Sequence, residues 1–258
     1  MTTRYELRDE VAIVTLARPE RFNAIDAALS SALVADLSRA EGEGRAVVLT
    51  GEGKAFCSGA DLSGFVDEYD DGGPDLAKHL DEEFHPMVQA IADCRLPLVA
   101  AVNGVAAGAG LGLALGCDIR VMAESAFLTS AFTAIGLAPD SGTTWLLPHH
   151  VGTSVALEMA LTNRRMQADE ALQRGLCVEV VPDEEVVDKA VGYAGRLAAM
   201  ATDALITTRR LIRGSSTLSF SDGLEAEKLE QGRLGRTPEH REGVMAFLEK
   251  REPDFRKS

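Results

Sequence analysis

The sequence predicts an α/β protein built on a mainly parallel sheet, and three observations point to that class. Short apolar segments typical of buried strands occur at residues 46–50 and 96–102. A helical repeat of Leu29, Leu33 and Leu37 precedes the first of these segments. Each of the two strands is followed by a glycine-rich loop, and open α/β sheets bind ligands beyond the carboxyl ends of their strands.

The N-terminal part alternates strands with a helix. Residues 5–7 and 11–16 are rich in β-forming residues and flank a charged turn, which predicts an opening hairpin. Asp26 is a good N-cap for the helix that carries the three leucines, and Gly42 and Gly44 end that helix. The strand–helix–strand order that results predicts parallel pairing.

The next segments predict a surface loop and then mainly helices. Residues 63–75 are acidic and rich in glycine, which indicates a mobile surface segment able to act as a lid. Apolar residues at helical spacing from 76 to 91 predict a second helix that is disturbed at Pro86. We expect further strands at 118–122, 126–129 and 178–181, and helices at roughly 152–162, 168–174, 184–199, 203–213, 218–234 and 238–250.

Composition limits the classes of partner. The net charge of −14 argues against nucleic acid and against an anionic membrane surface, because both usually bind basic proteins. No apolar run approaches the roughly 20 residues that span a bilayer. The first residues lack the pattern of a signal peptide, and the cysteines are too far apart for a metal motif. We therefore expect a cytoplasmic protein with reduced, mostly buried thiols.

The stretch from residue 98 to 112 carries the chemical signal. An apolar strand ends at Asn103-Gly104, and a run of small residues then leads into an apolar helix at 111–115. A strand, a small-residue turn and a helix start together offer backbone N–H groups to developing negative charge. A lone acid, Asp140, follows within residues 135–142. We interpret the pair as an oxyanion-stabilising turn that faces one acid–base carboxylate.

The same residues also fit other interpretations, and some classes of site are excluded. The glycines fit neither the dinucleotide fingerprint nor a P-loop, and no serine lies in a nucleophile elbow. Gly112 and Gly116 also suit close helix packing. Asp140 also suits an N-cap for a helix that begins near Ser141. His149 and His150 are adjacent, so they do not share one helix face, and we expect no metal site.

Three ordered motifs give the chain a family resemblance. Residues 54–62, 98–110 and 135–142, with the C-terminal segment 241–250, resemble the crotonase superfamily of enoyl-CoA hydratases and isomerases along essentially the whole chain. The resemblance implies a crotonase fold of stacked ββα turns over residues 1–200 and a helical oligomerisation region over 201–258. It also implies trimers or hexamers, an acyl-CoA thioester as substrate, and no cofactor beyond the coenzyme A of that substrate.

The resemblance further assigns individual residues. By position, the backbone N–H groups of Ala60 and Ala109 receive the thioester oxygen, where they stabilise an enolate. Asp61 and Leu62 lie at the adenine, and Gly112, Phe132 and His85 lie at the acyl group. The residues implied in coenzyme A binding are Arg18, Arg21, Phe247 and Lys250, the last two reaching a neighbouring subunit.

The departures from the family pattern favour one reaction. Hydratases of the family hold the attacking water with two glutamates, whose positions here are Gly112 and Phe132. Moving a double bond needs only one base, which removes a proton at one carbon and returns it at another. Asp140 suits that task. With an aspartate at this position, the sequence resembles the enoyl-CoA isomerases and the epoxyphenylacetyl-CoA isomerases. The sequence therefore favours isomerisation over hydration.

Three alternatives stay open at this point. The first is hydration. The second is dehalogenation as in the 4-chlorobenzoyl-CoA dehalogenases, with Asp140 as nucleophile and His85 beside it. The third is a non-catalytic acyl-CoA binder. The acyl group itself is not specified, because Phe65, Phe84, Phe132 and Trp145 suit an acyl pocket and ordinary core packing equally well.

Overall fold

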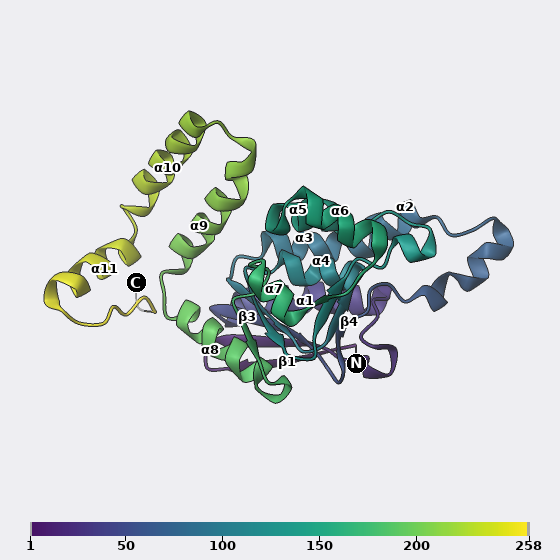
Figure 1. Ribbon diagram of the computed structural model, residues 1–258. Helices are drawn as coiled ribbons and strands as arrows, with labels where there is room; N and C mark the ends of the chain where they lie inside the picture. The colour runs from purple at the N-terminus through teal and green to yellow at the C-terminus, as the bar shows by residue number, and fades with distance from the viewer. Residues whose placement is uncertain (1, 257–258) are drawn as a thin grey trace.

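A six-stranded sheet forms the centre of the computed structural model, which describes residues 2–256 (Figure 1). Its strands, in spatial order, are β1 (Thr3–Arg8), β2 (Val11–Leu16), β3 (Ala46–Gly51), β5 (Leu98–Val102), β7 (Ile119–Ala123) and β10 (Glu179–Val181). β1 and β2 form the predicted antiparallel hairpin, and every other neighbouring pair is parallel. The prediction of a mainly parallel sheet is therefore confirmed.

A smaller second sheet lies beyond the ends of these strands. It contains β4 (Ala55–Cys57), β6 (Val105–Ala107), β8 (Phe127–Thr129) and β9 (Met166–Gln167). The sequence analysis treated residues 105–107 as part of a turn, and that was wrong. They form a strand because β4 lies alongside and pairs with them in parallel register. Nothing in this short run of Val and Ala distinguishes a strand from a turn until its neighbour is present.

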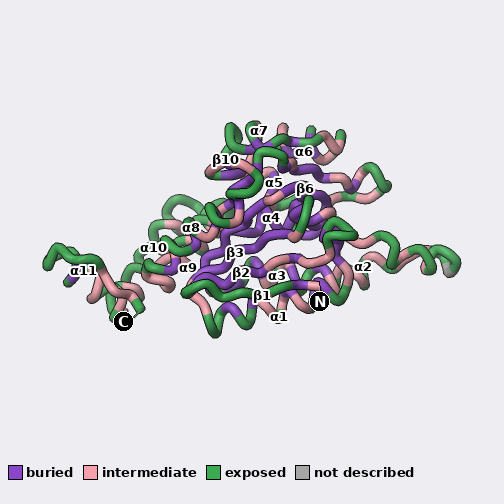
Figure 2. The backbone as a smooth tube through the Cα atoms, turned by 90° about the horizontal axis from the view of Figure 1, so that it is seen from below, coloured by how far each residue is buried: buried purple, intermediate pink, exposed green. Residues whose placement is uncertain are grey.

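Helices cover the large sheet. The predicted leucine helix is α1 (Ala27–Glu43), and the Asp26 side chain caps it by accepting a hydrogen bond from the Leu29 N–H. α8 (Val186–Ala198) packs across β2, β3, β5 and β7. α4 (Ala109–Gly116) has no exposed residue and contacts β4 and β6 of the smaller sheet as well as α3 and α5. Figure 2 shows the buried part of the chain concentrated in the strands and in α4.

The predicted acidic segment and second helix form one irregular stretch. Residues Leu62–Asp71 form a 3₁₀ helix, η2, and α2 (Leu76–His79) follows it. A π turn, η3 (Leu80–Phe84), then leads into α3 (His85–Asp93). The predicted disturbance is therefore present and begins before Pro86. Because Pro86 has no N–H to give to the preceding turn, the wider π turn accommodates it.

The C-terminal half is helical as predicted, with one helix that the sequence analysis did not assign. That helix is α5 (Thr143–Val151), which contains Pro148. The predicted helices appear within two residues of their expected bounds. They are α6 (Thr153–Thr162), α7 (Ala168–Gln173), α8, α9 (Thr202–Gly214), α10 (Phe220–Leu234) and α11 (Pro238–Glu249). Short 3₁₀ turns complete the elements: η1 (Pro19–Arg21), η4 (Thr133–Ile135), η5 (Asp183–Glu185) and η6 (Ser215–Thr217).

Two parts of the molecule project from opposite sides of the core. In Figure 1, α9, α10 and α11 project on one side of the core, and the η2–α2 stretch projects on the opposite side. The exposed helices α10 and α11 appear largely green in Figure 2. The predicted boundary near residue 200 stays a prediction, although α9 begins at Thr202, where the chain leaves the core.

We predict that Asp26→Ala lowers the free energy of unfolding by about 1 kcal/mol, since it removes the N-cap of α1. Asp26 also lies 3.1 Å from Arg18 as an ion pair. Asp26→Asn keeps a capping oxygen but loses the charge, so it separates the two contributions. Chemical denaturation should place Asp26→Asn near wild type, and equal losses in both variants would contradict the capping role.

Candidate active site

Two glycine turns meet at the carboxyl side of the sheets. β3 leads through β4 to Gly59, and β5 leads through β6 to Gly108, so parallel neighbours deliver both turns to the same edge. A Cβ built on Gly59 lies 3.1 Å from the carbonyl oxygen of Ala107 and 3.6 Å from the backbone nitrogen of Ala109. The two glycines adopt φ values of +100° and +54°. Only glycine combines such backbone angles with so close an approach.

The N–H of Ala60 faces the cavity side of its loop. Ile25 donates its N–H to the carbonyl of Gly59 at 2.7 Å and accepts the N–H of Asp61 at 2.8 Å. In extended chain, successive N–H groups point in opposite directions. Because the carbonyl of Gly59 and the N–H of Asp61 both point toward Ile25, the N–H of Ala60 between them points away from Ile25. Ala60 accordingly lines a cavity in that direction.

The N–H of Ala109 comes from the start of a helix. Ala109 is the first residue of α4, and Gly108 precedes it as N-cap without a capping side chain. The first N–H groups of a helix have no acceptor inside that helix, and the helix dipole adds positive potential there. Ala109 lines the same cavity as Ala60. Both residues thus border one cavity, and the predicted oxyanion site requires two backbone donors placed in this way.

Asp140 lies in the wall of this cavity. It does not cap α5, because the N-cap of that helix is Gly142 and no side chain caps it. The turn is held instead by the backbone, where Thr143 donates its N–H to the carbonyl oxygen of Asp140 at 2.8 Å. Its carboxyl oxygen Oδ1 accepts the Ser141 hydroxyl at 2.8 Å. The carboxyl group is therefore available to a ligand in the cavity.

The environment of Asp140 shifts the pKa of its carboxyl group upward. Burial raises the pKa of this carboxyl group above its ordinary value of 3.8. The Ser141 hydrogen bond and the charge of His85 act in the opposite direction and offset part of that rise. A carboxyl group whose pKa is raised gives and takes protons more readily near neutral pH. Asp140 therefore has the electrostatic character of an acid–base group.

The cavity has a volume of about 430 Å³, and most of its wall is apolar. Phe65 from η2, Phe84 from η3 and Phe132 beside η4 contribute aromatic rings. Its remaining lining residues are Ser58, Gly59, Ala60, Leu62, Leu76, His79, Leu80, Gly108, Ala109, Ala131, Ile135, Leu137, Ala138, Pro139 and Asp140. The arrangement suits an apolar acyl group whose polar end lies at the two backbone donors.

Sequence reasoning missed His79, which also lies in the cavity wall. Its Nδ1 is 2.8 Å from Oε1 of Glu83, and its Nε2 is 2.8 Å from Oε1 of Glu68. The Phe65 ring lies against the imidazole with centroids 4.8 Å apart. These carboxylates raise the pKa of His79, Glu83 most and then Glu68. The i,i+4 spacing of His79 and Glu83 was the available signal.

Two residues that the sequence analysis associated with the acyl group lie elsewhere. His85 is exposed, and its Nδ1 is 3.3 Å from Oδ1 of Asp81. Among the described residues, the cavity wall contains His79, the last residue of α2, and does not contain His85, the first residue of α3. Trp145 faces a different cavity, where its ring stacks on His149 with centroids 4.1 Å apart. His85 follows the π turn at the start of α3, and Trp145 lies in α5.

Arg18 is engaged within the protein. Its guanidinium lies 2.8 Å from Asp61 and 3.1 Å from Asp26 and also donates to the carbonyl of Ala24. Hydrogen bonds from Ser63 and then from Arg18 hold the pKa of Asp61 below its usual range. The pair fastens the loop of Ala60 to the N-terminal segment. Arg21 is the exposed cation of this loop. A contact between these arginines and coenzyme A stays a prediction.

The other residues predicted at coenzyme A lie far from this chain's own cavity. Phe247 on α11 is 82% exposed, and Lys250 follows the end of that helix. Figure 1 places α11 and the η2–α2 stretch at opposite ends of the molecule. A role for Phe247 and Lys250 at an active site therefore requires the site of another copy.

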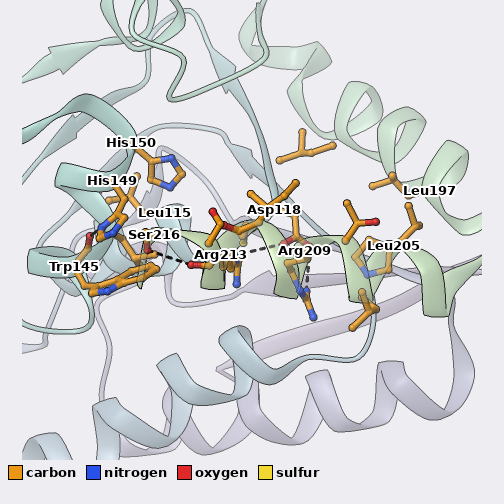
Figure 3. Close-up of a pocket in the computed structure, with 18 residues that line it drawn as sticks. Leu115, Asp118, Trp145, His149, His150, Leu197, Leu205, Arg209, Arg213 and Ser216 are labelled. Atoms are coloured by element: carbon orange, nitrogen blue, oxygen red, sulfur yellow. Dashed lines mark hydrogen bonds and ion pairs between the residues drawn. The ribbon is translucent and has the colours of Figure 1, made fainter. Parts of the chain in front are cut away.

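A larger cavity of about 660 Å³ lies between α5, α9 and the C-terminal end of α4 (Figure 3). Its charged groups are bound to one another, since Arg209 and Arg213 donate to Asp118 at 3.1 and 3.0 Å. Arg213 also donates to the carbonyl of Gly116 at 2.7 Å, at the end of α4. These contacts join α9 to the core, so this cavity lies at the junction of α9 with the core.

Further features bear on cofactors and membranes. Among residues 2–256, no cluster of three or more His, Cys, Asp or Glu side chains suits a metal ion. The cysteines Cys57, Cys94, Cys117 and Cys177 are buried free thiols, as expected. Burial raises their thiol pKa values to about 11 or 12. No helix in the described part of the chain is long and apolar enough to cross a membrane.

Comparison with known proteins places this site in a family. The family model for enoyl-CoA hydratase/isomerase matches residues 6–258. A Rhodobacter capsulatus protein named as a probable enoyl-CoA hydratase is 45% identical over 98% of this chain and 97% of its own length. The 1,2-epoxyphenylacetyl-CoA isomerase of Escherichia coli is 38% identical over 95% and 94%. The crystal structure of enoyl-CoA hydratase from Bacillus anthracis aligns with a TM-score of 0.90 at 31% identity, covering 98% of both chains.

The chain belongs to the enoyl-CoA hydratase/isomerase family and has the crotonase fold. Members of this family act on acyl-CoA thioesters. The relatives carry names of both activities, a hydratase and an isomerase. The choice between the two reactions therefore rests on the residues of the cavity.

We predict that the activity of the protein falls as pH decreases through the raised pKa of Asp140, because the group must be ionised to accept a proton. Ser141→Ala removes a hydrogen bond that lowers this pKa, so the acidic limb of the kcat/KM profile should move to higher pH. Ser154→Ala on the exposed face of α6 is the control. An unmoved limb in Ser141→Ala would exclude Asp140 as the titrating group.

We also predict that His79 holds η2 against the cavity. The hydrogen bonds of His79 to Glu68 and Glu83 should be strongest while the imidazole is protonated. They should weaken as pH rises through the raised pKa of His79, since the neutral ring loses one charge-assisted hydrogen bond. His79→Gln should increase hydrogen exchange in residues 62–71, corrected for intrinsic rates. Glu82→Gln, an exposed change on the same π turn, should leave that exchange unaltered. Equal protection in all three proteins would show that other contacts hold η2.

Proposed function

We propose that the protein isomerises an acyl-CoA thioester, moving a double bond with Asp140 as the single acid–base group. The observation that carries the proposal is one carboxyl group with a raised pKa in a largely apolar cavity opposite two backbone N–H donors. Hydrogen bonds from Ala60 and Ala109 to the thioester oxygen stabilise negative charge there in the transition state. The same geometry acidifies the carbon next to the thioester.

The reaction balances with these groups alone. The Asp140 carboxylate takes a proton from C2 of a 3-enoyl-CoA, and the electron pair of the broken C–H bond passes to the thioester oxygen as a dienolate. The carboxyl group then returns the proton to C4 while the electrons move back, so the double bond lies between C2 and C3. No water and no second acid are consumed. Epoxide isomerisation on a ring is a related outcome of the same enolate chemistry.

Two positions weigh against hydration. Addition of water needs a held and activated water molecule, and the family's hydratases use two glutamates for it. Here one of those positions is Phe132, whose ring lines the cavity and is 7% exposed. The other is Gly112, where an added Cβ would lie 2.4 Å from the carbonyl oxygen of Ser141. Neither position supplies a carboxylate, and position 112 also lacks room for a side chain.

Dehalogenation is supported less well than isomerisation. The proposal of a nucleophilic Asp140 with His85 beside the ring needs that imidazole at the acyl group. His85 is exposed and pairs with Asp81. Its charge still influences Asp140, which it makes more acidic. The wall contains His79 instead, and both nitrogens of that ring are occupied by carboxylates.

We further propose that the protein works as a trimer or as a pair of trimers. Large apolar side chains are exposed along α10 and α11. They include Phe220 at 84%, Phe247 at 82%, Leu248 at 67% and Leu229 at 64%. Exposed apolar patches of this kind mark protein–protein contacts. Assembly through these helices would also bring Phe247 and Lys250 toward the site of another copy.

Solvent-proton exchange tests the isomerase proposal. In D₂O, wild type should convert trans-3-hexenoyl-CoA to the 2-enoyl isomer, and Asp140→Asn should lower kcat by at least about 100-fold, because general acid–base groups contribute about 10²–10⁴. The substitution keeps the size of the side chain, so KM should change little. Hydration of crotonyl-CoA that survives Asp140→Asn would instead establish a hydratase. Tight binding without any exchange in wild type would establish a passive binder.

A further inference from the structure

Helix α4 touches the turn that carries Asp140. Gly112 lies one helical turn after Ala109, so the two residues share one face of α4. A Cβ built on Gly112 meets the carbonyl oxygen of Ser141 at 2.4 Å, its carbonyl carbon at 3.3 Å and its Cβ at 3.2 Å. The backbone of α4 is thus in direct contact with the residue next to the acid–base group.

The turn on the other side of this contact has little freedom to move. Ser141 is 2% exposed and adopts a φ of +50°, and Gly142 follows with a φ of +78°. The Thr143 N–H donates to the carbonyl of Asp140, and α5 begins at that residue and packs on α4. Helix α4 itself is wholly buried. A side chain at position 112 would therefore press on the turn, because Ser141 and the whole of α4 are buried where they meet.

We propose that Gly112 is a positioning residue that fixes the separation between the Asp140 carboxyl group and the oxyanion donor of Ala109. The inference rests on the isomerase function proposed above. It assigns the glycine a positive role, since the missing side chain allows the turn to rest on α4. A side chain at position 112 would force the Ser141 carbonyl oxygen, and with it the turn of Asp140, to move. The hydratase arrangement and the isomerase arrangement are then alternatives built on one contact.

The size of the expected effect follows from the distances. Ordinary contact with a Cβ begins at 3.4 Å, so the carbonyl oxygen of Ser141 must retreat by about 1 Å to accept a methyl group at position 112. A misplacement of about 1 Å in a reacting group costs on the order of 100-fold in rate. The donors of Ala60 and Ala109 precede Gly112 in the chain and keep their own supports. Substrate binding should therefore suffer far less than the chemical step.

The first test is Gly112→Ala, assayed with trans-3-hexenoyl-CoA. We expect kcat to fall by about 100-fold, with KM within about threefold of wild type. Gly116→Ala is the matched control on the same helix, because its added methyl group meets the Ile91 side chain at 2.9 Å and no backbone atom within 4 Å. It should retain kcat within about threefold, since the change lies at the other end of α4 from Asp140.

The decisive readout is rescue by a longer acid. If Gly112→Ala pushes the turn back, Asp140→Glu should restore part of the lost kcat in that background, because one more methylene extends the carboxyl group by about 1.5 Å. In the wild-type background the same change should reduce kcat. A merely structural defect would not be repaired by lengthening the acid. Absence of rescue, or a kcat for Gly112→Ala within threefold of wild type, would overturn the proposal.

A pair of changes on the turn keeps the proposal testable if Gly112→Ala does not fold. Ser141→Gly suits the observed φ and removes the Cβ that faces Gly112. Ser141→Ala loses the same hydroxyl group but keeps that Cβ. We expect kcat of Ser141→Gly to be about tenfold below that of Ser141→Ala, with equal KM. Equal kcat values would contradict the role of the contact.

The two proposals fail in different ways. A wild-type protein whose turnover does not depend on Asp140 overturns the isomerase function and this inference with it. An active, Asp140-dependent wild type beside a Gly112→Ala variant of unchanged kcat overturns the inference alone.

Discussion

The close approach of two backbone turns is the constraint on which the site depends. Neighbouring parallel strands end at the same edge of a sheet, and β4 and β6 carry that relation one step further to Gly59 and Gly108. A single methyl group on Gly59 would reach the backbone of the other turn. The turns can approach in this way because Gly59 has no Cβ to meet the Ala107 carbonyl and because Gly108 adopts a φ of +54°. The close approach of the two turns therefore depends on the parallel strand register and on both glycines.

Helix α4 connects this donor pair to the rest of the molecule. Its first residue supplies one donor, its middle touches the turn of Asp140, and its end is held by two arginines. Arg120, which is buried, donates to the carbonyl of Cys117 at 2.7 Å, and Arg213 from α9 donates to that of Gly116. Positive groups at the C-terminal end complement the helix dipole. The base and the donors thus keep their spacing through one short, buried helix.

The acid–base character of Asp140 depends on its surroundings. The turn places its carboxyl group in an apolar wall, where burial raises the pKa, and one hydroxyl group and the charge of His85 moderate that rise. An aspartate in water would be a weak base for a carbon acid. Among the described residues that line this wall there are three phenylalanines and no carboxylate besides Asp140, which favours the proposed reaction without water. The apolar lining around Asp140 therefore supports the proposed isomerisation more than a reaction that needs a bound water molecule.

The sequence alone determined the sheet class, the α1 cap at Asp26 and most helices, because strand patterns and caps are local. It also predicted Ala60, Ala109 and Asp140 as site residues, and all three line one cavity. Only the tertiary structure decided the contacts between distant segments. Residues 105–107 became a strand because β4 lies beside them. The cavity wall contains His79 rather than the predicted His85. Position 112 is filled by the backbone of Ser141, a contact across 29 residues that no local pattern encodes.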